Sequence, residues 1–583
     1  MYYFASWFGG EAINTSFLQS QQQSVQQRQG ERQKQAQGLR RARRWELIAA
    51  CQQLTDVQAR DALRTRLVPF VLIPGKTLYA AAGQPGFSTA RQRGVEIVAS
   101  ARPDDLLYAL QVVFGEQILH NSCFHLADDT PVYSASKRVT LAQAIFLLIV
   151  IAGVGVAMWF APEKTLIAAS AFFAVMFLAV VGLRLASVFP VKIRSILPDP
   201  TRTNEALPVY TVLVPLFKET GVINQLLTGL LALNYPASKL DIKLILEEKD
   251  TETRKAIAEL ILPSQFEVIV VPDAKPQTKP KALNYALHFA RGDLAVILDA
   301  EDVAEPDQLL RAVDVFAAAP PDLVCLQASL TFYNANENWL TRQFTIEYAV
   351  LFDLILPLLA SFGMPMPLGG TSNHFRMSAL RQLGSWDPFN VTEDADLGLR
   401  LARFGWRAEV LDSSTFEEAN NSFGNWLAQR ARWLKGWIQT WLVHMRHPII
   451  LWRQLGMTGF LIVQIIMAGI VVSTLAHPFF LGLIIWAVAT GSLLPVESTA
   501  LGTFLTGTGL AVFITGYAVT MAAGFVALRL RGLHNLRLSV LAMPIYWLLI
   551  SIAGWLAVKQ FITHPFHWNK TAHGLSKLNR RQN

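Results

Sequence analysis

The sequence contains few cysteines and few charged residues for its length. Cys51, Cys123 and Cys325 lie far apart in a chain of 583 residues, and no CxxC pair occurs. This spacing suggests neither a zinc site nor a disulfide framework. Charged residues make up only 16% of the chain and hydrophobic residues 52%, a balance that differs from that of an average soluble protein.

A cleavable signal peptide is also not expected. The first 45 residues are polar, and residues 18–44 are rich in Gln and Arg, a composition that cannot form a core. We expect a solvated tail or one that contacts anionic lipid head groups. Nucleic acid is not an expected partner, because no aromatic or structured segment accompanies the basic residues.

Apolar residues are concentrated in runs that approach or exceed the roughly 20 residues needed to cross a bilayer. The runs are residues 139–160, 165–189, 457–475, 478–494, 503–528 and 541–561. The sequence therefore predicts a polytopic membrane protein with six spans. Lys137, Arg138, Lys192 and Arg194 flank the first two runs on one side, which the positive-inside rule places in the cytoplasm.

The chain divides into six blocks by composition. We expect a polar tail at 1–44, a small α/β module at 45–137, two spans at 138–190, a domain of soluble character at 205–450, about four spans at 451–562 and a cytoplasmic tail at 563–583. An even number of spans returns both termini and the domain to the cytoplasm. Arg529, Arg531 and Arg537 disagree with this count, which puts them outside, unless a segment is re-entrant.

The domain at 205–450 alternates apolar strands with helices. Its strand-like segments are VYTVLVPLF, IKLILEE, FEVIVVP and LAVILD, and its helical segments include NQLLTGLLAL and KALNYALHFARG. This alternation predicts a parallel sheet covered on both faces. Ligands bind beyond the carboxyl ends of such strands, where Glu247, Glu248, Asp299 and Glu301 fall.

The stretch LDAED, residues 298–302, ends one of these strands with an acidic cluster. Asp299 and Glu301 are one residue apart and point to the same side, a geometry that suits Mg²⁺ or Mn²⁺. Such an ion completes its shell with phosphate oxygens, which implies a donor that carries a diphosphate. Lys279 opens the preceding helix, within reach of that diphosphate or its base. The alternative is an ordinary solvated turn.

Two further motifs have both a chemical and a structural interpretation. In TEDADLGLRL, residues 392–401, Asp394 is a candidate base that takes the proton of a sugar hydroxyl, while Thr392 and the acidic first turn also fit a helix cap. In QRARW, residues 429–433, the Trp-rich surroundings equally fit a helix that lies in the membrane interface.

In this order and between membrane spans, the motifs resemble those of the processive inverting family-two glycosyltransferases, such as cellulose, hyaluronan and chitin synthases. The motifs are Asp299-Ala300-Glu301, Thr392-Glu393-Asp394 and Gln429-x-x-Arg432-Trp433. The resemblance covers residues 205–450 and, in architecture, the flanking spans. It implies a GT-A-like nucleotide-sugar transferase domain with a parallel or mixed sheet, inserted between transmembrane helices. It also implies polymerisation of sugar from a UDP-sugar into a β-linked exopolysaccharide, with inversion and export.

The resemblance implies a role for each motif. Glu247 or Glu248 would contact the uracil, Asp299 and Glu301 would hold Mg²⁺ or Mn²⁺ and the donor diphosphate, and Asp394, with Glu393 beside it, would act as general base. Lys279 and Arg432 would bind the donor, and Gln429 and Trp433 the growing glycan. Three departures stand out: Glu-Glu replaces Asp-Asp, D-x-E replaces D-x-D with Asp302 as a substitute ligand, and no F-x-V-T-x-K sequence follows the domain.

The resemblance further implies a multi-pass protein of the bacterial inner membrane with a cytoplasmic catalytic domain. It leaves open export partners in the periplasm or outer membrane. No PilZ-type motif occurs, and the function of the 45–137 module stays open. Two alternatives remain: transfer of a single sugar to a lipid carrier, and a receptor or transporter whose transferase core is vestigial.

Overall fold

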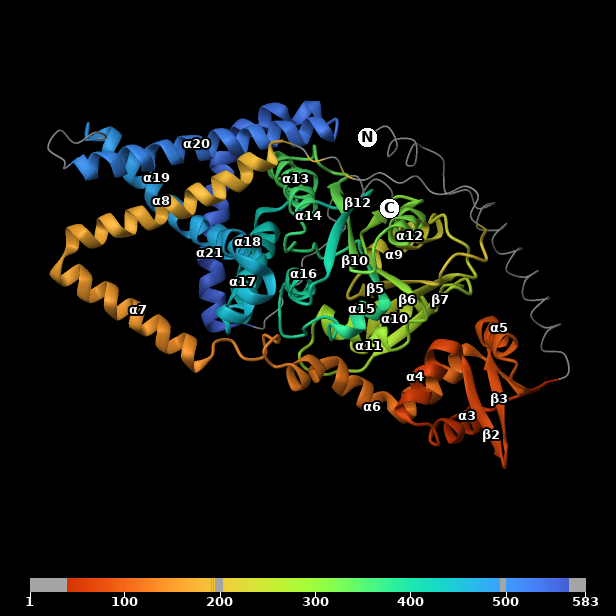
Figure 1. Ribbon diagram of the computed structural model, residues 1–583. Coiled ribbons are helices and arrows are strands. Elements are labelled where there is room, and N and C mark those ends of the chain that lie inside the picture. The colour runs from red at the N-terminus through yellow and green to blue at the C-terminus, as the bar shows by residue number, and fades with distance from the viewer. Residues whose placement is uncertain (1–38, 190, 192, 194–202, 493–499, 566–583) are drawn as a thin grey trace.

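The computed structural model describes residues 39–189, 191, 193, 203–492 and 500–565 (Figure 1). Most of the Gln/Arg-rich tail and the residues after 565 lie outside the described residues. The described chain consists of a small N-terminal module, a large α/β domain and long apolar helices. The prediction of a GT-A-like α/β domain with apolar helices and a small α/β module is confirmed.

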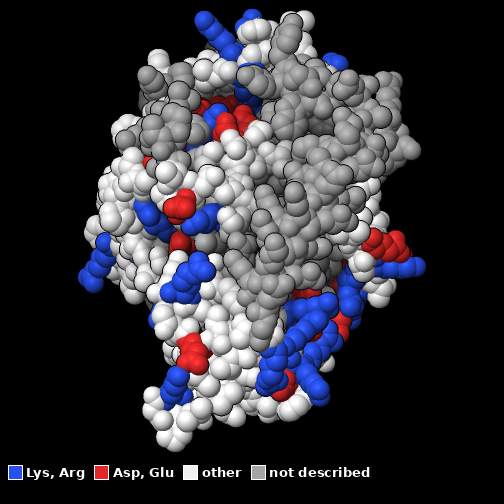
Figure 2. Space-filling model, turned by 90° about the vertical axis from the view of Figure 1, so that its right-hand side faces the viewer, with Lys and Arg blue, Asp and Glu red and all other residues white. Residues whose placement is uncertain are grey.

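The N-terminal module is a four-stranded sheet with helices against it. Its strands are β1 (Arg40–Arg41), β2 (Leu67–Ile73), β3 (Lys76–Ala82) and β4 (Ile97–Ala101), in the order β1-β4-β3-β2. Its helices are α3 (Arg44–Cys51), α4 (Asp56–Thr65), α5 (Gly83–Arg93) and α6 (Pro103–Asp129). On the face shown in Figure 2, basic and acidic side chains gather at the lower end, the level at which Figure 1 places this module.

The large domain is built on an eight-stranded sheet. Its strands are β5 (Tyr210–Leu216), β6 (Leu240–Glu247), β7 (Phe266–Val271), β8 (Leu294–Ile297), β9 (Val303–Ala304), β10 (Leu323–Phe332), β11 (Asn373–Arg376) and β12 (Arg407–Glu417). The order is β7-β6-β5-β8-β11-β10-β12-β9. The first four strands are parallel, whereas β11 is antiparallel to both its neighbours, so the sheet is mixed.

Helices and apolar clusters cover the sheet because its strands are apolar on both faces. Alternate residues of β5 illustrate this: Val212 and Val214 belong to one buried cluster, and Leu213 belongs to the other. The domain's helices are α9 (Ile223–Leu231), α10 (Thr251–Ala258), α11 (Lys279–Leu287), α12 (Gln308–Ala318), α13 (Trp339–Val350), α14 (Leu356–Ser361), α15 (Met377–Gln382), α16 (Glu393–Arg403) and α17 (Phe423–His444). The carboxyl ends of β5, β6 and β8 meet at one edge, which the following loops build into a site.

Six helical runs among the described residues are long and apolar enough to cross a membrane, judged by length and composition. They comprise α7 (Leu141–Phe160), α8 (Pro162–Ser187), Trp339–Ser361, Pro448–Ala489 with α18 (Pro448–Val463) and α19 (Ile470–Ala489), α20 (Ala500–Leu530), and His534–Thr563 with α21 (Met543–Thr563). In Figure 1, α7, α8, α19 and α20 extend away from the sheet.

The runs differ from the expected spans in two places. The segments 457–475 and 478–494 were expected as separate spans, but a single helical run contains Pro478 and continues through it. A proline inside a helix removes one backbone hydrogen bond without necessarily ending the helix. The run Trp339–Ser361 was not expected, and 61% of its most apolar window is buried inside the structure, where it packs between the sheet and α20.

One of the arginines that disagree with the expected topology contacts the large domain. Helix α20 runs back toward the sheet, and Arg531 just beyond its end forms an ion pair with Asp353. Arg531 also donates to the Leu330 carbonyl at 2.8 Å and to the Ser329 hydroxyl at 3.1 Å. The loop between α20 and α21 therefore lies on the same side as the sheet of the large domain.

The last helix, α21, lies along α17 rather than leading away from it. Near its start, the Tyr546 hydroxyl accepts hydrogen bonds from Trp426 and Arg430 of α17, each at 3.2 Å. Just beyond its end, the Pro565 carbonyl accepts a hydrogen bond from Gln439 of α17 at 3.1 Å. Both ends of α21 thus contact the same helix beside the large domain.

We predict that the loop before α21 and the large domain lie on the same side of the membrane. Single cysteines replacing Asn535 and Asp412, both exposed, should react with an impermeant maleimide in the same vesicle orientation, and one replacing Thr490 in the opposite orientation. The native cysteines are buried and should give little background. Labelling of positions 535 and 490 in the same orientation would contradict this topology.

Candidate functional site

The acidic end of β8 is a tight, buried turn. The Asp302 carboxylate accepts the Asp299 backbone N–H at 2.7 Å and the Thr371 hydroxyl, so one of its oxygens holds the turn together. Its other oxygen, Oδ1, is buried with no hydrogen-bond partner among the described residues. Burial, together with repulsion from Asp299 and Glu301, raises the pKa of Asp302 well above its usual range. An ordinary solvated turn does not fit these observations.

Lys279 lies against this turn. It begins α11, and its ammonium group forms an ion pair with Asp299 and donates to the Gly370 carbonyl at 2.9 Å. Asp299, Glu393 and Asp302 raise the pKa of Lys279 against the opposing effect of burial. Lys279 is therefore a charged group of the acidic site, as the sequence predicts.

A further carboxylate, Glu417, belongs to the same site and was not predicted. It ends β12, opposite Phe332 of β10. Burial, with repulsion from Asp302, Glu301 and Asp299, raises the pKa of Glu417 well above its usual range. Its Oε1 atom is buried without a hydrogen-bond partner among the described residues. Like Asp299 and Glu301, the Glu417-Glu418 pair places carboxylates at the end of a strand, a pattern that could have indicated a site residue.

The first turn of α16 brings two more carboxylates. Burial, with repulsion from Asp394, raises the pKa of Glu393 to about 7. Burial also raises the pKa of Asp394, whose Oδ1 accepts the Ala395 N–H at 2.8 Å. The Thr392 side chain makes no capping hydrogen bond, so the capping interpretation of this motif does not account for Thr392.

Arg432 of α17 is the second cation of the site. Burial lowers its pKa, while Glu393, Asp394 and Asp299 act in the opposite direction. These interactions connect the D-x-E, T-E-D and QxxRW motifs around one point in space. The site thus combines two cations with a larger number of carboxylates, namely Asp299, Glu301, Asp302, Glu393, Asp394 and Glu417.

A glycine lets α17 approach the start of α16 closely. A Cβ atom on Gly436 would lie 2.8 Å from the Thr392 Cβ, closer than real side chains approach one another. One turn further on, Thr440 accepts a hydrogen bond from Asn390 at 2.9 Å, and Gln439 accepts the Val391 N–H at 3.3 Å. These contacts hold α17 against the loop that precedes Asp394.

A buried ion network fixes the rest of the α16–α17 contact. Asp396 accepts the Arg400 Nε–H at 2.8 Å and lies 3.0 Å from the His444 Nε2 at the end of α17. The Arg403 guanidinium lies 3.1 Å from the other His444 nitrogen. These side chains are almost completely buried, so removing one would leave the others unpaired in a poor solvent for charge.

The first acidic pair lies apart from this cluster. Glu247, the last residue of β6, is buried and forms an ion pair with Lys281 at 2.8 Å, while burial raises its pKa. Glu248 is exposed, and its side chain accepts the Asp273 N–H at 3.2 Å. Of the two, Glu248 is the carboxylate that a ligand at this edge of the sheet can reach.

Gln429 and Trp433, which the motif resemblance assigns to the acceptor, face other partners. Gln429 accepts a hydrogen bond from Asn420 at 2.9 Å. Trp433 is half-buried, with its ring stacked 6.2 Å from Tyr348 and tilted 5.9 Å from Phe344. The Arg430 guanidinium lies 4.7 Å from the centre of the Trp433 ring. Trp433 is therefore part of an aromatic cluster against the middle of α17.

The carboxylates fit a divalent cation that takes most of its ligands from elsewhere. Within the described residues, no group of three or more His, Cys, Asp or Glu side chains is placed to hold a metal ion by itself. The partnerless oxygens of Asp302 and Glu417 show, however, that the site has unused acceptor capacity for positive charge. Mg²⁺ is commonly bound by one or two carboxylates together with phosphate oxygens and water.

The loop before β11 was also missed by the sequence analysis. The Gly370 carbonyl accepts from Lys279, and a Cβ atom on Gly370 would lie 3.2 Å from the Asp394 Oδ2. Gly369 donates its N–H to Gln327 at 2.7 Å. The Gly369-Gly370 dipeptide lets the backbone pass close to the two carboxylate motifs. Two consecutive glycines in the sequence could have indicated this close approach.

The site lies in the part of the chain that is similar to a known protein family. Residues 208–436 match the family model described as "Glycosyltransferase like family 2". This segment contains all the carboxylates of the site, together with Lys279 and Arg432. The large domain is thus similar in sequence to this family over less than half of the chain, and the match does not distinguish a processive subtype.

Curated relatives match part of the chain. The chain is 26% identical over 237 residues to "Probable glucomannan 4-beta-mannosyltransferase 1" of Arabidopsis thaliana, covering 39% of this chain and 43% of the relative. It is 28% identical over 244 residues to "Beta-monoglucosyldiacylglycerol synthase" of Trichormus variabilis, covering 41% of this chain and 50% of the relative. The chain thus spans about half the length of the curated relatives that it matches.

One match among solved structures is "Mannosyltransferase PcManGT from Pyrobaculum calidifontis in complex with GDP-Man and Mn2+". The identity is 19% and the TM-score 0.43, with 68% of this chain and 99% of that chain covered.

We predict that Gly436→Ala destabilises the protein by about 1–3 kcal/mol, because the added methyl group overlaps Thr392. Gly424→Ala, in the same helix, is the matched control, since nothing lies within 4 Å of its Cβ position. Thermal unfolding in detergent compares the two variants. Adding Thr392→Gly to Gly436→Ala should recover part of the loss. Equal stability of the two single variants would contradict the close approach of α17.

Proposed function

We propose that the protein transfers a sugar from a nucleotide diphosphate donor to a hydroxyl group of an acceptor, with inversion at the sugar carbon. The observation that carries this proposal is the convergence of Asp299, Lys279, Asp394 and Arg432 from separate elements on one buried site. A vestigial core would not be expected to keep so many repelling carboxylates buried together.

On the donor side, Asp299 and Glu301 would hold Mg²⁺ or Mn²⁺. When bound, the ion neutralises charge on the leaving diphosphate. Lys279 of α11 and Arg432 of α17 would donate hydrogen bonds to the phosphate oxygens. Glu248 lies beyond the end of β6, where it is accessible to the base of the nucleotide. We propose UDP as that nucleotide on the motif resemblance alone.

On the acceptor side, Asp394 would take the proton of the attacking hydroxyl. Its raised pKa makes it a better base than an exposed aspartate. With a pKa of about 7, Glu393 is largely protonated below neutral pH, which leaves the negative charge of the pair on Asp394. Asp299 contributes through its contact with Lys279 and the donor.

The acceptor is proposed to be a growing glycan that stacks on Trp433 and bonds to Gln429. The flat ring of Trp433 lies two turns before Thr440, on the helix that also carries Arg432. The alternative acceptor is a lipid, because one relative is named as a glucomannan mannosyltransferase and another as a monoglucosyldiacylglycerol synthase. The multi-pass helices fit either acceptor at a bacterial inner membrane, with the catalytic domain in the cytoplasm.

The purified full chain, incubated with single nucleotide sugars and membrane lipid, should release nucleotide from one of them. The product decides the acceptor: a polymer ladder on a gel supports the glycan, and a single glycolipid spot supports the lipid. Failure to release nucleotide from any donor tested, with lipid and divalent metal present, would contradict the proposed transfer.

We predict that Asp394→Asn lowers the rate of transfer by about 10²–10⁴-fold, the usual contribution of general acid–base catalysis. Asp412→Asn, at an exposed position on the same domain, is the matched control and should keep normal activity. Thermal unfolding checks that both variants are folded. Near-normal transfer by a folded Asp394→Asn variant would assign the base to another residue.

A further inference from the structure

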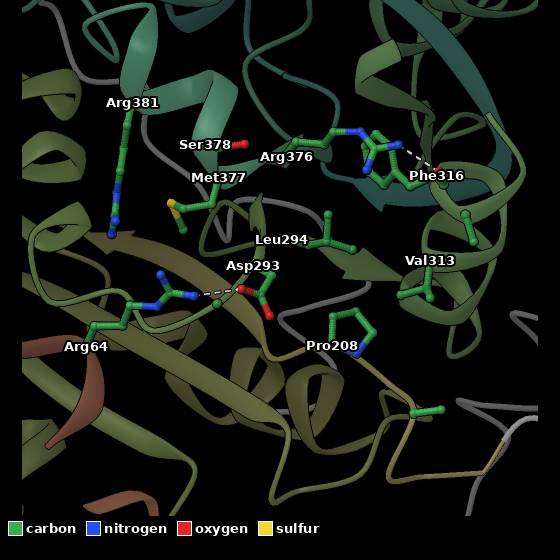
Figure 3. A pocket seen from close by; sticks show the side chains of 13 residues that line it. Arg64, Pro208, Asp293, Leu294, Val313, Phe316, Arg376, Met377, Ser378 and Arg381 are labelled. Atoms are coloured by element: carbon green, nitrogen blue, oxygen red, sulfur yellow. Dashed lines mark hydrogen bonds and ion pairs between the residues drawn. The ribbon is translucent and has the colours of Figure 1, made fainter. Parts of the chain in front are cut away.

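A cavity of about 610 Å³ lies at the edge of the sheet opposite the acidic site (Figure 3). Leu294, the first residue of β8, lines it, whereas Asp299 follows the other end of the same strand. Arg376, which pairs with Leu294 in the sheet, lines it from β11. The cavity is thus separated from the donor site by the length of β8, roughly 13 Å for four residues.

The charged residues that line this cavity are mostly positive. Among the described residues that line it, Arg64, Arg376 and Arg381 face one carboxylate, Asp293. Arg64 comes from α4 of the N-terminal module, and its guanidinium lies 3.0 Å from the Asp293 Oδ1. Figure 3 shows the side chain of Arg381 extending toward that of Arg64. The cavity therefore lies between the module and the catalytic domain and carries an excess of positive charge.

Two of these arginines have only neutral partners among the described residues. Arg376 donates to the Leu323 and Phe316 carbonyls at 2.9 and 2.7 Å. Arg381 donates to the Leu287 and Ala290 carbonyls at 3.3 and 3.2 Å. Burial, with repulsion from Arg64 and Arg60, lowers the pKa of Arg381, as expected for a cation without a counter-charge.

The remaining lining is largely apolar and suits an organic body next to the charges. Pro208, Leu294 and Val313 lie along one side of the cavity in Figure 3, and the Arg376 guanidinium lies 4.9 Å from the centre of the Phe316 ring. A volume of about 610 Å³ falls within the range of pockets that bind small organic ligands. Arginine is the residue best suited to phosphate groups.

We propose that this cavity binds a phosphorylated small molecule of about nucleotide size, held between Arg64 of the module and Arg381 of the catalytic domain. The ligand displaces Asp293 from Arg64 or shares that guanidinium with it. Arg64 is the lining residue that the module provides, so a bound ligand would join the module to the sheet. Binding at this second site does not depend on the proposed transfer reaction.

Binding to the detergent-purified full chain would be measured by calorimetry in EDTA, with pyrophosphate and ATP as separate probes. Tighter binding of ATP indicates a nucleotide, and equal binding indicates recognition of phosphate alone. Arg64→Gln should weaken binding by about 10–100-fold, the value of a charge-assisted hydrogen bond. Arg91→Gln, with the same charge change at an exposed residue of the module outside the cavity, is the control and should bind normally.

Asp293→Asn gives an effect of opposite sign. Loss of this carboxylate frees Arg64 and removes repulsion, so binding should become tighter, whereas a purely structural role would make it weaker. Arg64 and Asp293 are 56% and 55% exposed, and neither substitution leaves a buried gap. No saturable binding of either probe, or binding that Arg64→Gln leaves unchanged, would overturn the proposal. Probe binding that is lost in Asp299→Ala but kept in Arg64→Gln would also overturn it.

Discussion

The large domain is arranged around a buried excess of negative charge. Carboxylates from β8, β12 and α16 repel one another, and among the described residues Lys279 and Arg432 oppose them. In a medium of low dielectric, this repulsion raises the pKa values of Asp302, Glu393 and Glu417. The fold holds these groups together at a cost in stability, which bound cations would relieve. This excess of negative charge suits the divalent cation and diphosphate donor that we propose for the site.

The same helix connects this charge cluster to the apolar helices. Arg432 and Arg430 are two residues apart on α17, so they point about 200° apart around the helix. Arg432 interacts with Glu393 and Asp394, whereas Arg430 forms an ion pair with Glu347 and donates to Tyr546 of α21. A shift of α17 would therefore change contacts both at the site and with the helices beside it. This linkage would couple the proposed transfer site to the apolar helices beside it.

Much of the site could be predicted because it depends on local patterns. Asp299 and Lys279 follow from a strand end and a helix start, and Asp394 from the first turn of an amphipathic helix. The roles of Glu417, Gly370 and Gly436 could not be predicted in this way, because they depend on contacts between segments that are far apart in the sequence. Glu417 meets Asp302 only when β12 joins the sheet, and Gly436 matters only because Thr392 lies against it. The break that we expected between two spans at Pro478 does not occur, because a proline need not end a helix whose neighbours pack around it.

The central claim is that the buried carboxylates are completed by a divalent cation together with a nucleotide diphosphate. Calorimetry of UDP binding to the purified full chain, with Mn²⁺ or Mg²⁺ and then with EDTA, tests it most directly. The account predicts saturable UDP binding with metal, loss of that binding in EDTA, and no recovery on adding metal to Asp299→Ala. UDP binding of equal strength with and without metal, unchanged by Asp299→Ala, would contradict it.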